Sequence, residues 1–128
     1  QIWVIGGDTM VLSQGKVFGK PRSQADAFRM LNQLSGSTHS VYSAVALMHD
    51  GAVFSRMNET RVTFRDLTTT EIEDYWATGE PADKAGAYGI QGIAARFIDK
   101  IEGSYSAVMG LPLFELDQLL IESDFYKA

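Results

Sequence analysis

Two long strand-like segments separated by a tight-turn signal constrain the fold of this chain more than any other feature. Residues 39–47 have the composition of a β-strand, with apolar side chains at alternate positions. The sequence HDGA at 49–52 is typical of a hairpin turn. A second strand-like segment follows at 53–65. Because such a turn reverses the chain, we expect the two segments to pair antiparallel.

Shorter strand signals lie on both sides of this pair. The apolar run at 2–5 predicts a strand buried on both faces. Apolar residues on either side of a Gln-Gly pair at 14–15 predict a hairpin. Near the carboxyl end we expect strands at 94–101 and 105–109, joined by a Glu-Gly turn.

Three helices are expected between and after these strands. A serine–aspartate capping pair predicts a helix that begins after Ser23, and a capping box predicts another after Thr68. Pro112 suits the first turn of a final helix. Strands and helices are interleaved, although several strand pairs are hairpins. The sequence therefore predicts a single α/β domain over residues 1–128, a β-sheet of mixed direction packed by helices.

Composition excludes several classes of function. The net charge of −5 over 128 residues argues against binding a nucleic-acid polymer, because phosphates attract a basic surface. The sequence contains no cysteine, and its two histidines, His39 and His49, lack the spacing of a zinc site. No apolar run approaches the roughly 20 residues that span a bilayer. We expect a soluble, cytoplasmic protein that binds neither a membrane nor nucleic acid.

One carboxylate interrupts the first apolar run. Asp8 follows Gly6 and Gly7, and we expect it at the carboxyl end of a strand, where α/β sheets bind ligands. Paired glycines let a substrate or an ion approach the backbone. A carboxylate there can hold a hard cation such as Mg²⁺ or accept a proton from an attacking water. The alternative is that Asp8 caps a turn, and these residues alone do not decide between the two.

Two cations flank a proline just after the expected hairpin. Lys20 and Arg22 suit phosphate binding, because arginine offers paired donors and lysine a point charge. A solvated surface loop is the commoner explanation for such a pair.

A glycine-rich loop at 80–92 carries mixed chemistry. Its glycines recur at every third position from 86 to 92, a spacing that matches neither a dinucleotide-binding nor a Walker motif. Lys84, Tyr88 and Gln91 place a cation, a flat ring and an amide in this loop. Such a set can read the edge of a nucleobase. A purely structural loop, with Tyr88 in the core, is an equal alternative.

Three separated motifs become informative when they are taken together. They are GGDTMV at 6–11, GKP at 19–21 and GEPADKAGAYGIQG at 79–92. These motifs resemble the Maf family of nucleoside triphosphate pyrophosphatases, and the segments 34–47 and 103–116 are also similar to it. The resemblance extends over essentially the whole chain and implies a Maf/ITPase-like fold.

The resemblance implies hydrolysis between the α and β phosphates of a nucleoside triphosphate, with Mg²⁺ or Mn²⁺, to a monophosphate and pyrophosphate. Asp8 falls on the family's essential acid, described as the proton acceptor, and we also expect it to hold the metal. Thr9 and Gln91 fall on positions associated with substrate choice, and Lys20 falls on a phosphate-contacting lysine. We expect Lys84 to bind the substrate as a further cation.

The form of the third motif resembles the branch of the family that acts on dTTP and UTP. Family members are typically cytoplasmic homodimers, proposed to clear noncanonical nucleotides and linked to arrest of septum formation. The expected partners are therefore dTTP, UTP or modified pyrimidine nucleotides and a second copy of the chain.

The family normally carries a serine- and arginine-rich loop of the form S-x-S-x-R-R before the first motif. That loop grips the triphosphate, and a glutamate and a lysine of the site follow it. We expect this chain, which starts at the strand leading into the first motif, to be the carboxy-terminal portion of the fold and to hydrolyse dTTP slowly by itself. The alternatives are a noncatalytic nucleotide-binding module linked to cell division, and an enzyme for another triphosphate such as methylated GTP.

Overall fold

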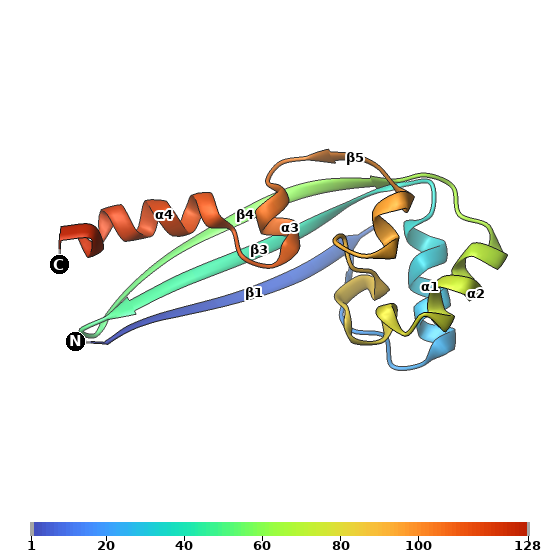
Figure 1. The fold of residues 1–128 in the computed structure, drawn as a ribbon, viewed down its shortest axis with the longest axis horizontal. Helices are drawn as coiled ribbons and strands as arrows, with labels where there is room; N and C mark the ends of the chain where they lie inside the picture. The colour runs from blue at the N-terminus through green and yellow to red at the C-terminus, as the bar shows by residue number, and fades with distance from the viewer. Residues whose placement is uncertain (1, 128) are drawn as a thin grey trace.

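A five-stranded sheet forms the centre of the computed structural model, which describes residues 2–127 (Figure 1). The strands are β1 (Trp3–Ser13), β2 (Lys16–Phe18), β3 (Thr38–His49), β4 (Ala52–Phe64) and β5 (Ile98–Glu102). Their order is β2-β1-β3-β4-β5. The helices are α1 (Gln24–Leu34), α2 (Thr69–Ala77), α3 (Tyr105–Met109) and α4 (Leu113–Glu122), with short 3₁₀ turns η1 (Glu80–Asp83), η2 (Ala85–Ala87), η3 (Ile93–Phe97) and η4 (Phe125–Lys127).

The expected α/β sheet packed by helices is confirmed, but the relative directions of its strands differ from the prediction. Every pair of neighbouring strands among residues 2–127 is antiparallel, so the described sheet is not of mixed direction. The reason lies in the connections. The pairs β1–β2 and β3–β4 are hairpins, and the chain returns from α1 so that β3 runs opposite to β1.

The hairpin at the centre of the sheet forms as its sequence predicts. β3 pairs with β4 from Thr38 opposite Thr63 to His49 opposite Ala52. The two residues of the turn, Asp50 and Gly51, have φ of 49° and 78°, as a type I′ turn requires. With β1 alongside β3, the three strands make a long ribbon that extends away from α1 and α2 (Figure 1).

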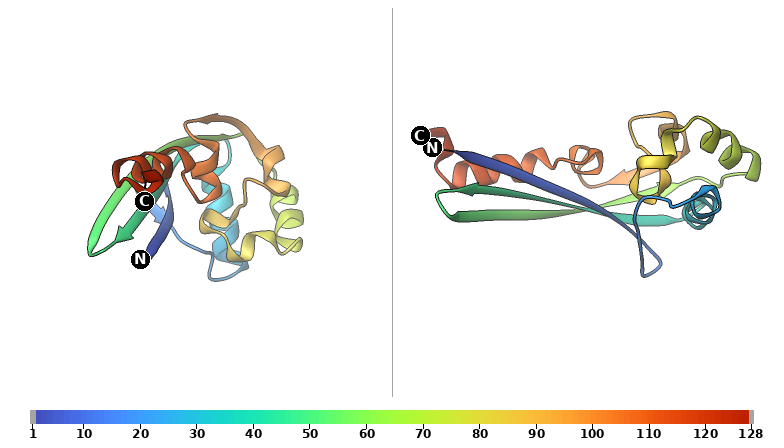
Figure 2. Two further views of the ribbon diagram at one scale, coloured as in Figure 1. Left: turned by 60° about the vertical axis from the view of Figure 1, so that its left-hand side comes forward. Right: turned by 90° about the horizontal axis from the view of Figure 1, so that it is seen from below.

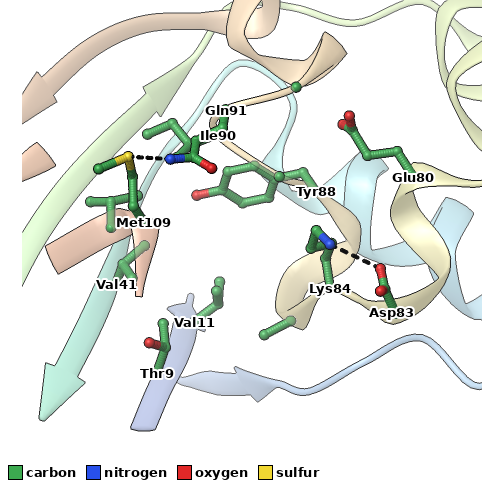
Figure 3. A pocket seen from close by; sticks show the side chains of 14 residues that line it. Thr9, Val11, Val41, Glu80, Asp83, Lys84, Tyr88, Ile90, Gln91 and Met109 are labelled. Carbon is green, nitrogen blue, oxygen red and sulfur yellow. Dashed lines mark hydrogen bonds and ion pairs between the residues drawn. The ribbon is translucent and has the colours of Figure 1, made fainter. Parts of the chain in front are cut away.

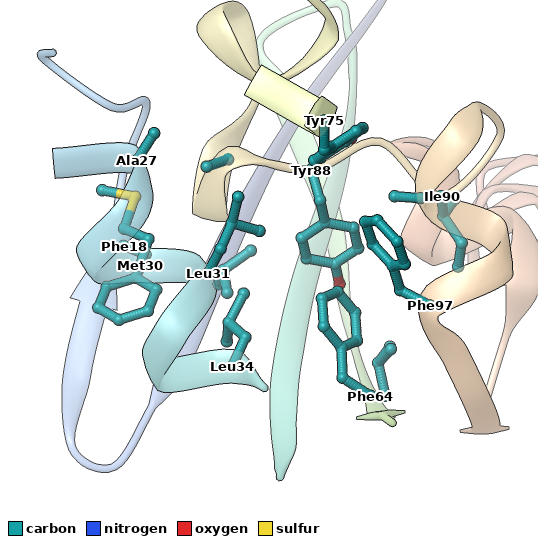
Figure 4. Packing of buried hydrophobic residues seen from close by; sticks show 14 of the residues in the cluster. Phe18, Ala27, Met30, Leu31, Leu34, Phe64, Tyr75, Tyr88, Ile90 and Phe97 are labelled. Atoms are coloured by element: carbon teal, nitrogen blue, oxygen red, sulfur yellow. The ribbon is translucent and has the colours of Figure 1, made fainter. Parts of the chain in front are cut away.

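Both expected caps are present. The Ser23 hydroxyl accepts a hydrogen bond from the backbone N–H of Asp26 at 3.1 Å and begins α1. Thr68 and Glu71 form the reciprocal capping box of α2. Figure 4 shows how the two helices and the segment after α2 enclose one core, in which Tyr88 packs edge-on against Phe64 with ring centroids 4.8 Å apart.

A second, smaller core lies along the ribbon. α4 covers one face of the strands, where Leu116 and Leu119 pack on Val45 and Leu47 (Figure 2). The opposite face is open, and Met57 on that face is 67% exposed. Within the described residues, no helix is long and apolar enough to cross a membrane.

Two strand predictions are wrong. The run at 2–5 is not buried on both faces, since Ile2 and Val4 are 77% and 46% exposed. Helix α4 packs on β3 and β4, and at this end of β1 only Trp3 among the described residues packs against the core under α4, whereas Ile5 on the same face is 50% exposed.

The second wrong prediction concerns residues 105–109, which form helix α3 and not a strand. The Ser104 hydroxyl accepts the backbone N–H of Ala107 at 3.2 Å and caps this helix. Gly103 and Gly110, with φ of 136° and 121°, turn the chain on either side. The neighbouring prediction at 94–101 is only partly confirmed, because β5 begins at Ile98 after the turn η3.

Candidate functional site

A pocket of about 450 Å³ opens between the sheet and the glycine-rich loop (Figure 3). This volume lies in the range of small-ligand sites. The lining residues come from β1 (Thr9, Val11), β3 (Val41), the loop and its first turn (Glu80, Asp83, Lys84, Ala85, Tyr88, Gly89, Ile90, Gln91, Gly92) and α3 (Val108, Met109). The pocket therefore joins segments that are far apart in the sequence.

Two glycines, one directly before the loop and one within it, have positive φ, a backbone conformation that favours glycine. Gly79 and Gly86 have φ of 81° and 73°. A Cβ on Gly86 would lie 3.2 Å from the side chain of Val11, and the Gly86 N–H donates to the carbonyl of Gly19 at 3.0 Å. Gly86 thus fastens the loop to β1 and to the turn that carries Lys20.

Two of the expected cations, Lys84 and Lys20, lie on the side of the pocket that the glycine-rich loop forms. Lys84 donates to Asp83 at 3.0 Å, and this hydrogen bond lowers the pKa of Asp83. Lys20 makes a smaller electrostatic contribution in the same direction, although it is exposed and does not line the pocket. The pair Lys84–Asp83 is exposed to solvent, so the lysine can exchange its partner at little cost.

Tyr88 lies at the boundary between the pocket and the core. It is 6% exposed, and its hydroxyl lies 2.7 Å from Nε2 of the buried His39. Burial lowers the pKa of His39 to about 4, which keeps the imidazole neutral. Nδ1 of His39 has no hydrogen-bond partner among the described residues. The neutral imidazole carries one N–H, and either Nε2 or the Tyr88 hydroxyl can be the donor in this hydrogen bond.

Thr9 and Gln91 complete the polar lining. The Thr9 hydroxyl lies 3.4 Å from that of Ser43 on β3. The Gln91 amide is exposed and donates to the sulfur of Met109 on α3. The structure therefore brings Thr9, Lys84 and Gln91 to one pocket, as their expected common role requires (Figure 3).

Asp8 does not lie in this pocket. β1 continues without interruption through Asp8, so this residue is in the middle of a strand and not at its end. Successive side chains of a strand leave opposite faces, and Asp8 lines a separate shallow hollow of about 260 Å³ with Ala44, Ala46 and Ser55. Its carboxylate accepts the backbone N–H of Thr9 at 2.9 Å.

Sequence reasoning did not single out Met109 and Glu80, which both line the pocket. Met109 belongs to none of the three sequence motifs. Residues 105–109 were expected to form a strand and not the helix that places Met109 in the pocket. Glu80 also escaped notice, although it stands at the first position of the loop. Its carboxylate accepts the hydroxyl of Tyr75 and, at 3.1 Å, the backbone N–H of Ile93. The only sequence signal was its place next to Pro81 in the third motif.

Comparison with known proteins identifies the family. A family model described as Maf-like protein matches residues 1–123. The chain is 62% identical over 126 residues to a protein of Hydrogenovibrio crunogenus named dTTP/UTP pyrophosphatase, and the match covers 98% of this chain and 66% of that relative. A protein of the same name from Vibrio vulnificus is 55% identical over 119 residues, which are 93% of this chain and 64% of that relative.

This chain thus spans slightly less than two thirds of the length of these relatives. The match nevertheless includes all three motifs, the pocket and the two strands of the central hairpin. The chain belongs to the Maf family.

Proposed function

We propose that this chain carries the nucleotide-binding pocket of a pyrophosphatase that acts on dTTP and UTP. The observation that carries the proposal is the meeting of Thr9, Lys84 and Gln91 in one pocket. The family resemblance assigns Thr9 and Gln91 to substrate choice, and we expect Lys84 to bind the substrate as a further cation. The names of the relatives, dTTP/UTP pyrophosphatase, support the same substrate class.

The roles of these side chains follow from their chemistry. Gln91 offers both a donor and an acceptor, which suits the edge of a pyrimidine base, and Tyr88 supplies an aromatic wall beside it. Lys84 supplies positive charge to the phosphates, with Lys20 near the same side. Catalysis of phosphoryl transfer depends mainly on stabilising the negative charge of the transferred phosphoryl group, which nearby cations do.

Asp8 can join this reaction at the free edge of β1. Strand β2 pairs with β1 only from Val11 to Ser13, so among the described residues the outer edge of β1 has no strand partner at Asp8 and Thr9. A nucleotide with its base in the pocket and its phosphates across this edge meets Thr9 on one face and Asp8 on the other. In this arrangement the Asp8 carboxylate accepts the proton of the attacking water.

The residues present are compatible with a divalent cation held partly by the substrate. Within residues 2–127 there is no group of three or more ligating side chains that would form a preformed metal cage. Mg²⁺ commonly takes only one or two carboxylates together with substrate phosphates, and the exposed carboxylate of Asp8 fits that pattern. Such an ion, Mg²⁺ or Mn²⁺, would neutralise phosphate charge beside Asp8.

The family resemblance also supports a homodimer in the cytoplasm as the working form. The direct test of the proposed function is release of pyrophosphate from a panel of nucleoside triphosphates with Mg²⁺, by this chain and by the Hydrogenovibrio relative. We expect dTTP and UTP to be preferred, at a lower rate in this chain. Failure of this chain to bind or cleave any of them would contradict the proposal.

A further inference from the structure

The glycine-rich loop is closed on itself by one carboxylate and one phenol. Glu80 accepts the backbone N–H of Ile93 at 3.1 Å through one oxygen and the hydroxyl of Tyr75 through the other. The Tyr75 oxygen in turn accepts the backbone N–H of Gly89 at 3.1 Å. Gln91 lies between the two backbone groups that this network holds.

The base of the network is rigid. Tyr75 is fully buried at 0% exposure, and its ring packs edge-on against Phe97 with centroids 5.3 Å apart. Burial and the hydrogen bond to Glu80 raise the pKa of Tyr75, so its hydroxyl remains a donor. The position of Glu80 is therefore fixed from the core and not by solvent-exposed contacts alone.

Two glycines of the loop have no side chain, and the space that a side chain would fill is occupied by Glu80 and Lys84. A Cβ on Gly92 would lie 1.7 Å from Oε1 of Glu80, so no other residue fits without displacing the carboxylate. A Cβ on Gly89 would lie 3.2 Å from Cε of Lys84. The same short segment thus packs against the acid that holds it and against the lysine of the pocket.

We infer that Glu80 is a positioning residue of the nucleotide site, which fixes Gln91 relative to Lys84 through Tyr75 and the backbone of the loop. This inference rests on the proposed function. The two carboxylate oxygens accept hydrogen bonds from Tyr75 and Ile93, and through these bonds Glu80 orients the loop.

Two variants separate this role from a general contribution to stability. In Glu80→Gln one of the two acceptors becomes a donor, so Tyr75 and Ile93 can no longer both be satisfied. Tyr75→Phe keeps the buried ring and removes only the link to Glu80 and Gly89. Glu73→Gln, at an exposed glutamate of α2, is the matched control.

The experiment combines calorimetric titration with dTTP and amide hydrogen exchange followed by NMR. We expect both variants to bind dTTP about tenfold more weakly, the factor expected for loss of one charge-assisted hydrogen bond. Exchange at Gly89 and Ile93 should accelerate about tenfold while exchange in β3 stays within about twofold of the parent. The double variant should lose little more affinity than either single variant, because the residues act as one unit.

Three outcomes would count against these statements in different ways. Unchanged dTTP affinity in Glu80→Gln, with a parent chain that does bind dTTP, overturns the inference and leaves the proposed function standing. Exchange that rises equally in the loop and in β3 overturns it as well, since Glu80 would then be merely structural. A parent chain that does not bind dTTP overturns the proposed function, and the inference falls with it.

Discussion

Asp8 and Thr9 are neighbours in β1, yet their side chains leave opposite faces of the strand. Thr9 lines the pocket that also holds Lys84 and Gln91, and Asp8 lines a hollow on the open face of the ribbon. A substrate that uses both must cross the edge of the strand. The proposed catalytic acid and the proposed base-reading residues are thus separated by the thickness of one strand.

Replacement of the acid should separate catalysis from binding. We predict that Asp8→Asn lowers the rate of pyrophosphate release at least about a hundredfold, because the proton acceptor is lost. Because Asp8 is exposed, the fold should be retained, and dTTP affinity should change less than about threefold. Asp99→Asn, at an exposed acid of β5, is the control. Parent-like turnover in Asp8→Asn would show that Asp8 is structural.

Gln91 should determine which nucleotide is preferred. Its amide is held at the pocket by Met109 and by the turn between Gly89 and Ile93. We predict that Gln91→Ala reduces the preference for dTTP and UTP over purine triphosphates about tenfold, because one base contact is lost. A binding panel measures this, with the exposed Gln118→Ala as control. An unchanged ranking would remove Gln91 from base recognition.

Replacement of Gly86 should destabilise the folded protein. Its φ of 73° is costly for any residue with a Cβ, and that Cβ would press on Val11 at 3.2 Å. We predict that Gly86→Ala lowers the free energy of unfolding by about 2 kcal/mol. Gly6→Ala, where no atom lies within 4 Å of the added Cβ, should change it by less than about 0.5 kcal/mol. Urea unfolding of both variants checks the difference.

His39 should make the protein less stable in mild acid. Its pKa is about 4 in the folded chain, below its ordinary value of 6.5. The unfolded chain therefore binds the proton first as the pH falls, and stability is lost from about pH 6.5 down through pH 4. Between pH 7.5 and 4.5 this contribution is about 2–3 kcal/mol.

The matched variant for this prediction is His39→Gln, which cannot titrate and keeps a neutral partner for Tyr88. Urea unfolding at the two pH values should show a smaller loss for this variant than for the parent. Equal losses would mean that His39 does not cause the acid sensitivity.

Local signals predicted much of the fold because they act over a few residues. The turn at Asp50 and Gly51 and the caps at Ser23 and Thr68 depend only on neighbouring backbone, and all formed as expected. Residues 105–109 have strand-like composition, but the cap at Ser104 begins a helix there. The exposure of the run at 2–5 could not be predicted, since burial depends on where α4 packs.

Thr9, Lys84 and Gln91, three of the expected site residues, meet in one pocket, whereas Asp8 and Lys20 do not line it. The face of Asp8 was not predictable, because Gly6 and Gly7 suggested that the strand ends there and the strand in fact continues. The role of Glu80 depends on a side chain that reaches across the loop, a contact with no local pattern.

The most direct test of the central claim is to map where dTTP binds by NMR chemical-shift changes in the backbone amides of this chain. The claim is that the pocket between β1 and the 80–92 loop receives the nucleotide. It predicts the largest shifts at Thr9, Lys84 and Gln91, with smaller ones at α4. Shifts confined to α4 or the open face of the ribbon, or none at millimolar dTTP, would contradict it.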